Sequence, residues 1–454
     1  MYFSLPVLYC IAQPAANRRS FNVEHRKHLQ ACIDYIEQNL KTEIELRELA
    51  EFSGYSLYHF SRLFQKATGM SVVRYVQRRR LIHGIWDISR GSSGIDTALT
   101  YGFETYAGFY RAFLREFGCT PTQYIQAGRV RTPCRHDLNK EGHMIITHKR
   151  AAELLKHWNL DHLPIQDIYS ESTGEKHEHT LLVGDEYIIK FSADSEKLRR
   201  HIQLSACLAK QGLIAAEALP TTDGEFLIQD GSLFCCVTHK CGGTHIPPES
   251  LYADNTAKTW YIGNILAHLH RALKELEIPL NEVNQLETVQ NWALSRAQAV
   301  LHLPESLLTN YKDTFASLYP TLPRQIIHRD PNPGNMLFDN GKWGFIDFDL
   351  TEINARLFDP CYAATAILSE TFRPEDDAHN LRWLDICREI LRGYDEEAHL
   401  TPDEWAAVPA MILTNQLVCI AWFAEQGNYP KILETNIRMT RWLADHYQDL
   451  PSAP

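Results

Sequence analysis

We expect no apolar run in this sequence to be long enough to cross a bilayer, and the cysteines show no regular spacing. The apolar opening, residues 2–12, is too short to span a membrane and has no basic residue before it, so we expect a disordered or loosely packed leader. The eleven cysteines are scattered, and Cys235 and Cys236 are adjacent within an apolar run. This usage is typical of a reduced, cytoplasmic protein. Because no long apolar run is expected to span a bilayer, no membrane partner is predicted.

Zinc-type spacing is also missing. Cys134, His136, His143 and His148 lie close together, but no Cys-x2-Cys pair accompanies them, which disfavours a zinc site. From Gly128 to about residue 150 the helical periodicity stops while Arg, His and Thr-Pro persist. This segment is predicted to connect two domains.

Charge is divided unevenly along the chain. The 454 residues predict two or three domains, and a hydrophobic share of 44% is enough to form their cores. Residues 1–150 contain 21 Lys and Arg against 13 Asp and Glu, whereas the rest contains 24 against 43. The two parts are therefore expected to have different partners, and the acidic part suits a cationic ligand, although many soluble enzymes are simply acidic.

The basic part contains an internal repeat. Residues 60–64 (Phe-Ser-Arg-Leu-Phe) and 109–113 (Phe-Tyr-Arg-Ala-Phe) are each followed by a glycine at the same distance. Upstream of them, Gly54 and Gly102 each stand four residues after an alanine and directly before an aromatic residue. Each unit is therefore predicted to be a helix, a tight glycine turn and a second helix, which is a helix-turn-helix written twice.

A helical spacer of about 20 residues, 71–90, separates the two units. Such a helix is about 30 Å long, and successive major grooves lie about 34 Å apart, so one chain could reach two adjacent grooves of double-stranded DNA. The arginines at 78–80 are expected to form a solvated or phosphate-facing surface.

Outward positions on the second helix of each unit are the candidates for DNA contact. Arg62 is the best candidate for bidentate contact with a guanine, with a phosphate contact or a structural ion pair as alternatives. The second unit has Ala107 and Gly108 where polar residues are common, which favours shape and phosphate contacts there. The candidates are Ser56, which is also a plausible N-cap, Leu57, Tyr58, Ser61 and Arg62 in the first unit, and Thr105, Tyr106 and Arg111 in the second.

The second unit carries the most specific motif, Tyr101-Gly102-Phe103-Glu104 through Phe117-Gly118-Cys119-Thr120-Pro121-Thr122-Gln123-Tyr124. With this motif, residues 24–128 resemble the AraC/XylS-type DNA-binding domain. The resemblance implies an all-α double helix-turn-helix that binds double-stranded DNA and regulates transcription.

The acidic part contains a second motif, His328-Arg329-Asp330 followed by Asn335 and, after an apolar strand, Asp347. In phosphoryl transfer one Asp accepts the proton of the attacking hydroxyl, while an Asn and a later Asp hold Mg²⁺ against the phosphates. Asp330, Asn335 and Asp347 fit these roles in order. The pattern resembles the aminoglycoside-phosphotransferase-like branch of the protein-kinase fold, which implies ATP or GTP and Mg²⁺ as cofactors.

That resemblance extends toward the start of the acidic part. Lys190, in the second strand of a predicted hairpin at 180–191, resembles the lysine that binds nucleotide phosphates, with an exposed lysine on an edge strand as the alternative. The strand and hinge at 234–243 resemble the segment whose backbone, near Val237 and His239, meets the adenine edge. The acidic partner expected for Lys190 is not obvious, because the following helix carries His201 near that position.

Taken together, the sequence predicts a multidomain protein, an all-α double helix-turn-helix domain followed by an α+β bilobal kinase-like domain. The expected boundaries are a leader at 1–23, the DNA-binding domain at 24–128, a linker at 129–150 and the kinase-like domain at 151–454. The predicted function is a transcription regulator whose kinase-like domain binds Mg-ATP and a small hydroxylated, cationic ligand and phosphorylates a hydroxyl. The alternative is an inactive kinase-like domain that serves as the ligand sensor. The oligomeric state is not fixed, and a homodimer stays open.

Overall fold

The computed structural model describes residues 23–117, 119–126, 146–169, 176–231, 233–253, 256–426 and 430–453, and the single positions 130, 133, 136 and 138. The predicted leader, Cys134 and His143 lie outside the described residues. His148 belongs to them and lies 2.9 Å from Asp167. Within the described part of the chain, no group of three or more His, Cys, Asp or Glu side chains is arranged to hold a metal ion.

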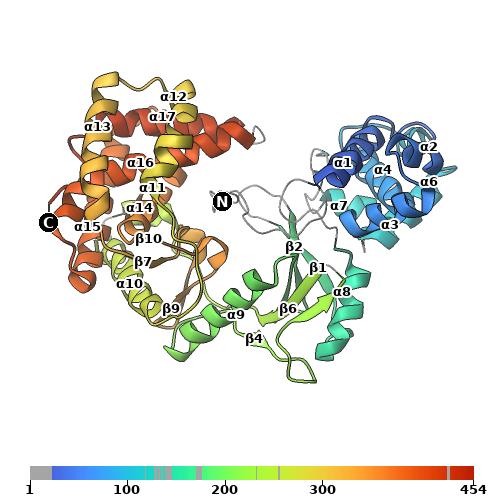
Figure 1. The fold of residues 1–454 in the computed structure, drawn as a ribbon, viewed down its shortest axis with the longest axis horizontal. Helices are drawn as coiled ribbons and strands as arrows, with labels where there is room; N and C mark the ends of the chain where they lie inside the picture. Colours follow the sequence, from blue (N-terminus) through green and yellow to red (C-terminus); the bar gives the residue numbers. More distant parts are fainter. Residues whose placement is uncertain are drawn as a thin grey trace.

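The first described part of the chain is all helical (Figure 1). The two predicted helix-turn-helix units are confirmed, because both turns place a glycine in the left-handed region, Gly54 with φ 74° and Gly102 with φ 77°. Ser56 caps its helix by accepting a hydrogen bond from the backbone N–H of His59, as predicted. The helices are α1 (Val23–Gln38), α2 (Leu46–Phe52), α3 (Leu57–Thr68), α4 (Val72–Ser89), α5 (Gly94–Thr100), α6 (Tyr106–Phe117) and α7 (Pro121–Gln126).

Each unit has its own apolar core, and α4 contributes to both. Phe60, Phe64 and Tyr75 are fully buried in the first core, and Phe109 and Phe113 in the second. Because α4 supplies Tyr75 to one core and other apolar residues to the other, it sets the relative placement of α3 and α6.

An antiparallel sheet forms the start of the acidic part. Its strand order is β1-β2-β3-β6-β4, and β5 also pairs with β6. The helix α8 (His148–Leu155) packs on one face of the sheet, while α9 follows β3. The elements are β1 (Ile165–Tyr169), β2 (Lys176–Val183), β3 (Tyr187–Ser192), α9 (Ser195–Lys210), β4 (Ala218–Leu219), β5 (Ile228–Asp230) and β6 (Leu233–His239), with a 3₁₀ helix (Lys156–Trp158) after α8.

The remainder is a larger, mainly helical lobe (Figure 1). Its helices are α10 (Thr256–Lys274), α11 (Gln285–Thr288), α12 (Leu294–Leu301), α13 (Glu305–Leu318), α14 (Phe358–Thr371), α15 (Asp377–Ala398), α16 (Pro402–Gln426) and α17 (Pro430–Asp445), with a π-helical turn (Val289–Ala293) between α11 and α12. Its strands are β7 (Arg324–Ile327), β8 (Met336–Asp339), β9 (Lys342–Phe345) and β10 (Glu352–Ala355), and its 3₁₀ helices are Pro248–Tyr252, Tyr319–Thr321, Pro333–Asn335 and Phe348–Leu350. β7 pairs with β10, and β8 pairs with β9.

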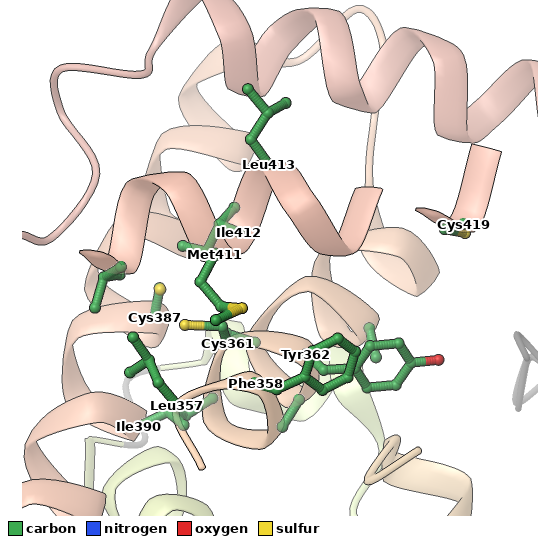
Figure 2. Close-up of a cluster of buried hydrophobic side chains, with 14 of the residues drawn as sticks. Leu357, Phe358, Cys361, Tyr362, Cys387, Ile390, Met411, Ile412, Leu413 and Cys419 are labelled. Atoms are coloured by element: carbon green, nitrogen blue, oxygen red, sulfur yellow. The ribbon is translucent and has the colours of Figure 1, made fainter. Parts of the chain in front are cut away.

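Part of the core of this lobe lies between α14, α15 and α16, and Figure 2 shows a cluster of its buried apolar side chains. The segment Pro402–Glu425 is long and apolar enough to cross a membrane, so the prediction that the sequence contains no such run was wrong. However, 94% of its most apolar window is buried inside the lobe, and α16 is the central core helix there.

Candidate active site and DNA interface

The predicted catalytic loop follows β7 and is held by its own side chains. Asp330 is 5% exposed. The Nδ2 of Asn332 donates to its Oδ1 at 2.9 Å, and the Nδ2 of Asn335 donates to its backbone carbonyl at 2.9 Å and to its Oδ2 at 3.3 Å. Asn332 was missed in the sequence, although it belongs to the same motif. Both oxygens of Asp330 are thus fixed by amides on one short loop.

Asp347 is brought to the same place by β9. The backbone N–H of Ile346 donates to the carbonyl of Asn335 at 3.0 Å, which fixes the two segments against each other. Asp347 itself has φ 66°, a left-handed conformation that costs energy for a residue other than glycine and is common at functional sites. The structure therefore brings the three predicted residues, Asp330, Asn335 and Asp347, together at one site.

The electrostatics of this site suit a cation. Burial raises the pKa of Asp330 to about 7, with a further contribution from the charge of Asp347. Burial also raises the pKa of Asp347 to about 6, aided by the charge of Asp349. Mg²⁺ takes oxygen ligands and is commonly held by one or two carboxylates together with substrate phosphates. The carboxylate of Asp347 and the amide oxygen of Asn335 fit that requirement.

Asp359, at the start of α14, fixes the backbone of the catalytic loop. It is fully buried and accepts hydrogen bonds from the N–H of His328 at 2.8 Å and of Arg329 at 3.0 Å. The Nε2 of His270 also lies 2.8 Å from its carboxylate. Since a carboxylate only accepts, His270 donates from Nε2, and its Nδ1 is hydrogen-bonded to the hydroxyl of Tyr394 at 2.6 Å.

This network depends on a close contact between α10 and α15. A Cβ at Gly263 would collide with the carbonyl oxygen of Ile390, and one at Gly393 with that of Trp260. The two backbones therefore touch, and this contact places His270 of α10 beside Tyr394 of α15. Sequence reasoning missed the role of Asp359 because its partners lie 30 to 89 residues away.

Lys190 lies on β3, which is a central strand between β2 and β6 rather than an edge strand. The lysine is half-buried, and its positive charge lowers the pKa of Asp347. The predicted alternative of an exposed lysine on an edge strand was therefore wrong.

The acid expected opposite Lys190 is not on α9. Glu196 is exposed and pairs with Arg199. The next residue of α9, Lys197, instead reaches the loop after β9, where its Nζ lies 3.0 Å from Asp349. Burial raises the pKa of Asp349, but Lys197 and then Lys190 outweigh this effect and hold it well below its usual range. Burial lowers the pKa of His201 to about 3, so this ring is neutral. The helix is thus tied to the loop after β9 by an ion pair that the sequence did not indicate.

The two predicted hinge residues are engaged in the sheet. Val237 is fully buried and is paired with Ile189 on β3 and Leu219 on β4. The N–H of His239 donates to the carbonyl of Glu217 at 2.8 Å. This donor is therefore not free to meet an adenine edge, which is a departure from the sequence prediction.

The first predicted DNA-contact surface is exposed. On α3, Tyr58 is 73% exposed, and the guanidinium of Arg62 lies over its ring at 5.7 Å. Leu57 is also exposed, while the hydroxyl of Ser61 donates to the carbonyl of Leu57 at 2.8 Å. Arg62 and Tyr58 therefore form the accessible part of this surface.

The second surface, on α6, is more restricted. Arg111 is exposed, and the hydroxyl of Thr105 accepts from the N–H of Gly108 at 3.0 Å, so Thr105 caps the helix. Tyr106 is half-buried, stacks on Phe109, and lies so close to Gly94 that a Cβ there would be 2.8 Å from its ring. Its ring therefore packs within the domain.

The arginines of α4 are not a solvated surface, and that prediction was wrong. Arg78 is 9% and Arg79 8% exposed. Arg78 pairs with Glu116 of α6 at 3.1 Å, and the Nη2 of Arg79 donates to Glu37 of α1 at 2.9 Å. Arg80 donates to the carbonyls of Leu40 and Thr42. These side chains fasten α4 to both units.

Comparison with known proteins matches both parts of the chain. Residues 49–127 match the helix-turn-helix domain family, and residues 174–399 match the phosphotransferase enzyme family. The chain is 30% identical over 132 residues to the HTH-type transcriptional activator AarP of Providencia stuartii, covering 27% of this chain and 87% of AarP. It is 35% identical over 101 residues to the uncharacterized HTH-type transcriptional regulator YbfP of Bacillus subtilis (strain 168), covering 22% of this chain and only 34% of that protein.

Among solved structures, a microcompartment-associated aminopropanol kinase aligns with a TM-score of 0.49 and 17% identity, covering 66% of this chain and 97% of that one. The predicted fold class, an all-α double helix-turn-helix followed by an α+β kinase-like domain, is confirmed by the described helices and strands and by the two family matches. The chain belongs to the AraC-type helix-turn-helix family, and the region behind that DNA-binding part is similar to the phosphotransferase enzyme family over residues 174–399.

Proposed function

We propose that this protein is a cytoplasmic, sequence-specific transcription regulator whose kinase-like domain phosphorylates a hydroxyl of a small molecule. The proposed division is a DNA-binding domain at 24–128, a linker at 129–150 and a kinase-like domain at 151–454. The observation that carries the proposal is the convergence of Asp330, Asn335 and Asp347, with both oxygens of Asp330 fixed by amides.

In this proposal Asp330 accepts the proton of the attacking hydroxyl. A pKa raised to about 7 makes it a stronger base than an ordinary carboxylate. Asn335 and Asp347 hold Mg²⁺, which neutralises charge on the nucleotide phosphates when bound. Lys190 contacts those phosphates from β3, and the backbone beyond β6 meets the base of ATP or GTP.

The acceptor binds beside Asp330, where Tyr362 lines the site. Its hydroxyl points away from the apolar cluster in Figure 2 and lies against the carboxylate of Asp330. Tyr362 feels the charge of Asp330 directly, so it is close enough to bind a polar acceptor group. The excess of acidic residues beyond position 150 favours a cationic acceptor such as an aminoglycoside or an amino alcohol.

A thermal-shift screen of aminoglycosides and amino alcohols, with and without Mg-ATP, tests the binding part, because ligands that bind the folded state raise its melting temperature. Hits are then assayed for ATP-dependent phosphorylation. Asp330→Ala should abolish turnover, while Asp339→Ala, which removes an exposed carboxylate nearby, should not. Equal turnover by the two variants would refute the assigned role of Asp330.

A second candidate is a ligand sensor without turnover. This candidate is favoured by α9, because this helix carries neutral His201 at the position where an acidic residue would hold Lys190 in place for phosphate transfer. If Asp330→Ala keeps the ligand response of the promoter after turnover is lost, sensing is sufficient. Loss of both together supports a signal that depends on phosphorylation.

The DNA-binding part is tested with an operator obtained by in vitro selection. Arg62→Ala should weaken binding by about 1–3 kcal/mol and relax specificity at one base pair if the arginine contacts a guanine. Arg90→Ala is the control, because Arg90 is an exposed arginine at the C-cap of α4 and belongs to neither predicted DNA-contact helix. Unchanged affinity and specificity in Arg62→Ala would contradict the contact.

A further inference from the structure

A small pocket lies between α9 and the 3₁₀ turn that follows Asp347. One wall is basic and consists of Lys197, Arg200 and His201 from a single face of α9. The opposite wall contains Phe348, Asp349 and Thr351. The pocket thus joins the small lobe to the loop that carries a proposed metal ligand, and the proposed reaction gives it no role.

Two buried side chains of this pocket lack hydrogen-bond partners among the described residues. Both ring nitrogens of His201 are unpartnered although the residue is only 5% exposed, and the Oγ1 of Thr351 is also unpartnered and buried. Buried polar groups are nearly always hydrogen-bonded, and leaving one unpaired costs about 1–3 kcal/mol. The pocket therefore offers one ring N–H of His201 and the hydroxyl of Thr351 as donors that a bound group can satisfy.

The charges of the side chains that line the pocket indicate whether a bound group would be a cation or an anion. Asp349 is engaged by Lys197 at 3.0 Å, whereas Arg200 forms no ion pair within 4 Å in the described part of the chain. The lining therefore has a net positive charge, with one unpaired guanidinium beside the imidazole and the hydroxyl. A cation would meet two positive side chains, while an oxyanion would meet donors on both walls.

We propose that this pocket binds a small oxyanion, a phosphate or a carboxylate group, through Arg200, Lys197, His201 and Thr351. The bound anion would bridge α9 and the turn after Asp347, and so stabilise one placement of α9 relative to that loop. Binding itself does not depend on the proposed function. Only its consequence, a change in nucleotide affinity, rests on that function.

Isothermal titration of the full chain with potassium phosphate, and separately with potassium acetate, tests the proposal at constant ionic strength set by potassium chloride. One anion per chain should bind, and the comparison of the two salts tells a phosphate site from a carboxylate site. Arg200→Ala should weaken binding about tenfold or more, as expected for loss of one charge-assisted hydrogen bond. His201→Leu should weaken it similarly.

Arg199→Ala is the matched control, because Arg199 is the neighbouring arginine on α9 but is 59% exposed and pairs with Glu196. It removes the same charge and should leave anion affinity unchanged. Equal affinity in Arg199→Ala and Arg200→Ala would place the anion elsewhere and overturn the proposal. Absence of binding for both salts would also overturn it and leave a pocket filled by water. The titration contains no nucleotide, so an inactive phosphotransferase does not affect its result.

Discussion

Asp359 should be the residue on which the geometry of the catalytic loop most depends. Its carboxylate accepts from two consecutive backbone N–H groups, those of His328 and Arg329, and from His270. All of these groups are buried. Removing the carboxylate leaves three buried donors without an acceptor.

The magnitude follows from these contacts. Asp359→Ala leaves three buried donors unpaired, and each costs about 1–3 kcal/mol. We therefore expect the free energy of unfolding to fall by about 4–7 kcal/mol. Asp359→Asn keeps one acceptor oxygen. If the asparagine places this oxygen toward His328 and His270, its NH₂ group faces the N–H of Arg329, and only that donor lacks an acceptor. The free energy of unfolding is then expected to fall by about 2–4 kcal/mol.

Urea unfolding followed by tryptophan fluorescence measures the loss, and hydrogen exchange of the peptide after β7 locates it. Exchange should accelerate at the amides of His328 and Arg329 before it changes elsewhere. The control is Asp385→Ala, because Asp385 is 79% exposed and its ion pair is with Arg388 on the same helix, so a change within about 0.5 kcal/mol is expected. A loss below about 1 kcal/mol in Asp359→Ala would refute the network, given the cost of three unpaired donors.

Two further predictions concern buried charges. Burial lowers the pKa of His328 to about 4, so the unfolded chain binds a proton near pH 6.5 before the folded one does. The contribution of neutral His328 to the free energy of unfolding of the wild type is complete above pH 6.5 and falls by about 3 kcal/mol toward pH 4. His328→Gln lacks this contribution and should not show this pH dependence. A difference in unfolding free energy between the two proteins that does not change with pH would contradict this. Glu37→Gln should destabilise the DNA-binding helices by about 2–4 kcal/mol, because it breaks the buried pair with Arg79, while exposed Glu51→Gln should change little in thermal unfolding.

Features of short range could be predicted from the sequence. The repeat around Gly54 and Gly102 encodes a left-handed turn between two apolar stripes, and both turns form as expected. The motif from Asp330 to Asp347 spans one strand-loop-strand unit, so its spacing alone brings its three polar residues together. In each case the determining contacts lie within about twenty residues of one another.

Features that depend on distant partners could not be predicted. The arginines of α4 suggested a solvated or DNA-facing surface, but their partners Glu37 and Glu116 lie 38 to 42 residues away. The same holds for Lys197, whose partner Asp349 stands on the other lobe. From the sequence alone, a charged side chain on a helix could face solvent, contact a phosphate or form a buried ion pair. Only the folded structure shows which acidic residue lies close enough to pair with it.

The two parts of the protein meet where α7 approaches β1. Burial raises the pKa of Tyr124, on the last described helix of the DNA-binding part, and the charge of Asp167 adds to this rise, whereas a hydrogen bond with Tyr169 opposes it. Asp167 also contacts His148 at the start of α8. A regulatory coupling of about 1–3 kcal/mol changes DNA affinity 5–150-fold, and one or two net hydrogen bonds are worth about as much. The free energy of this contact is therefore large enough to couple ligand binding in the kinase-like domain to DNA affinity, provided that ligand binding shifts β1 relative to α7.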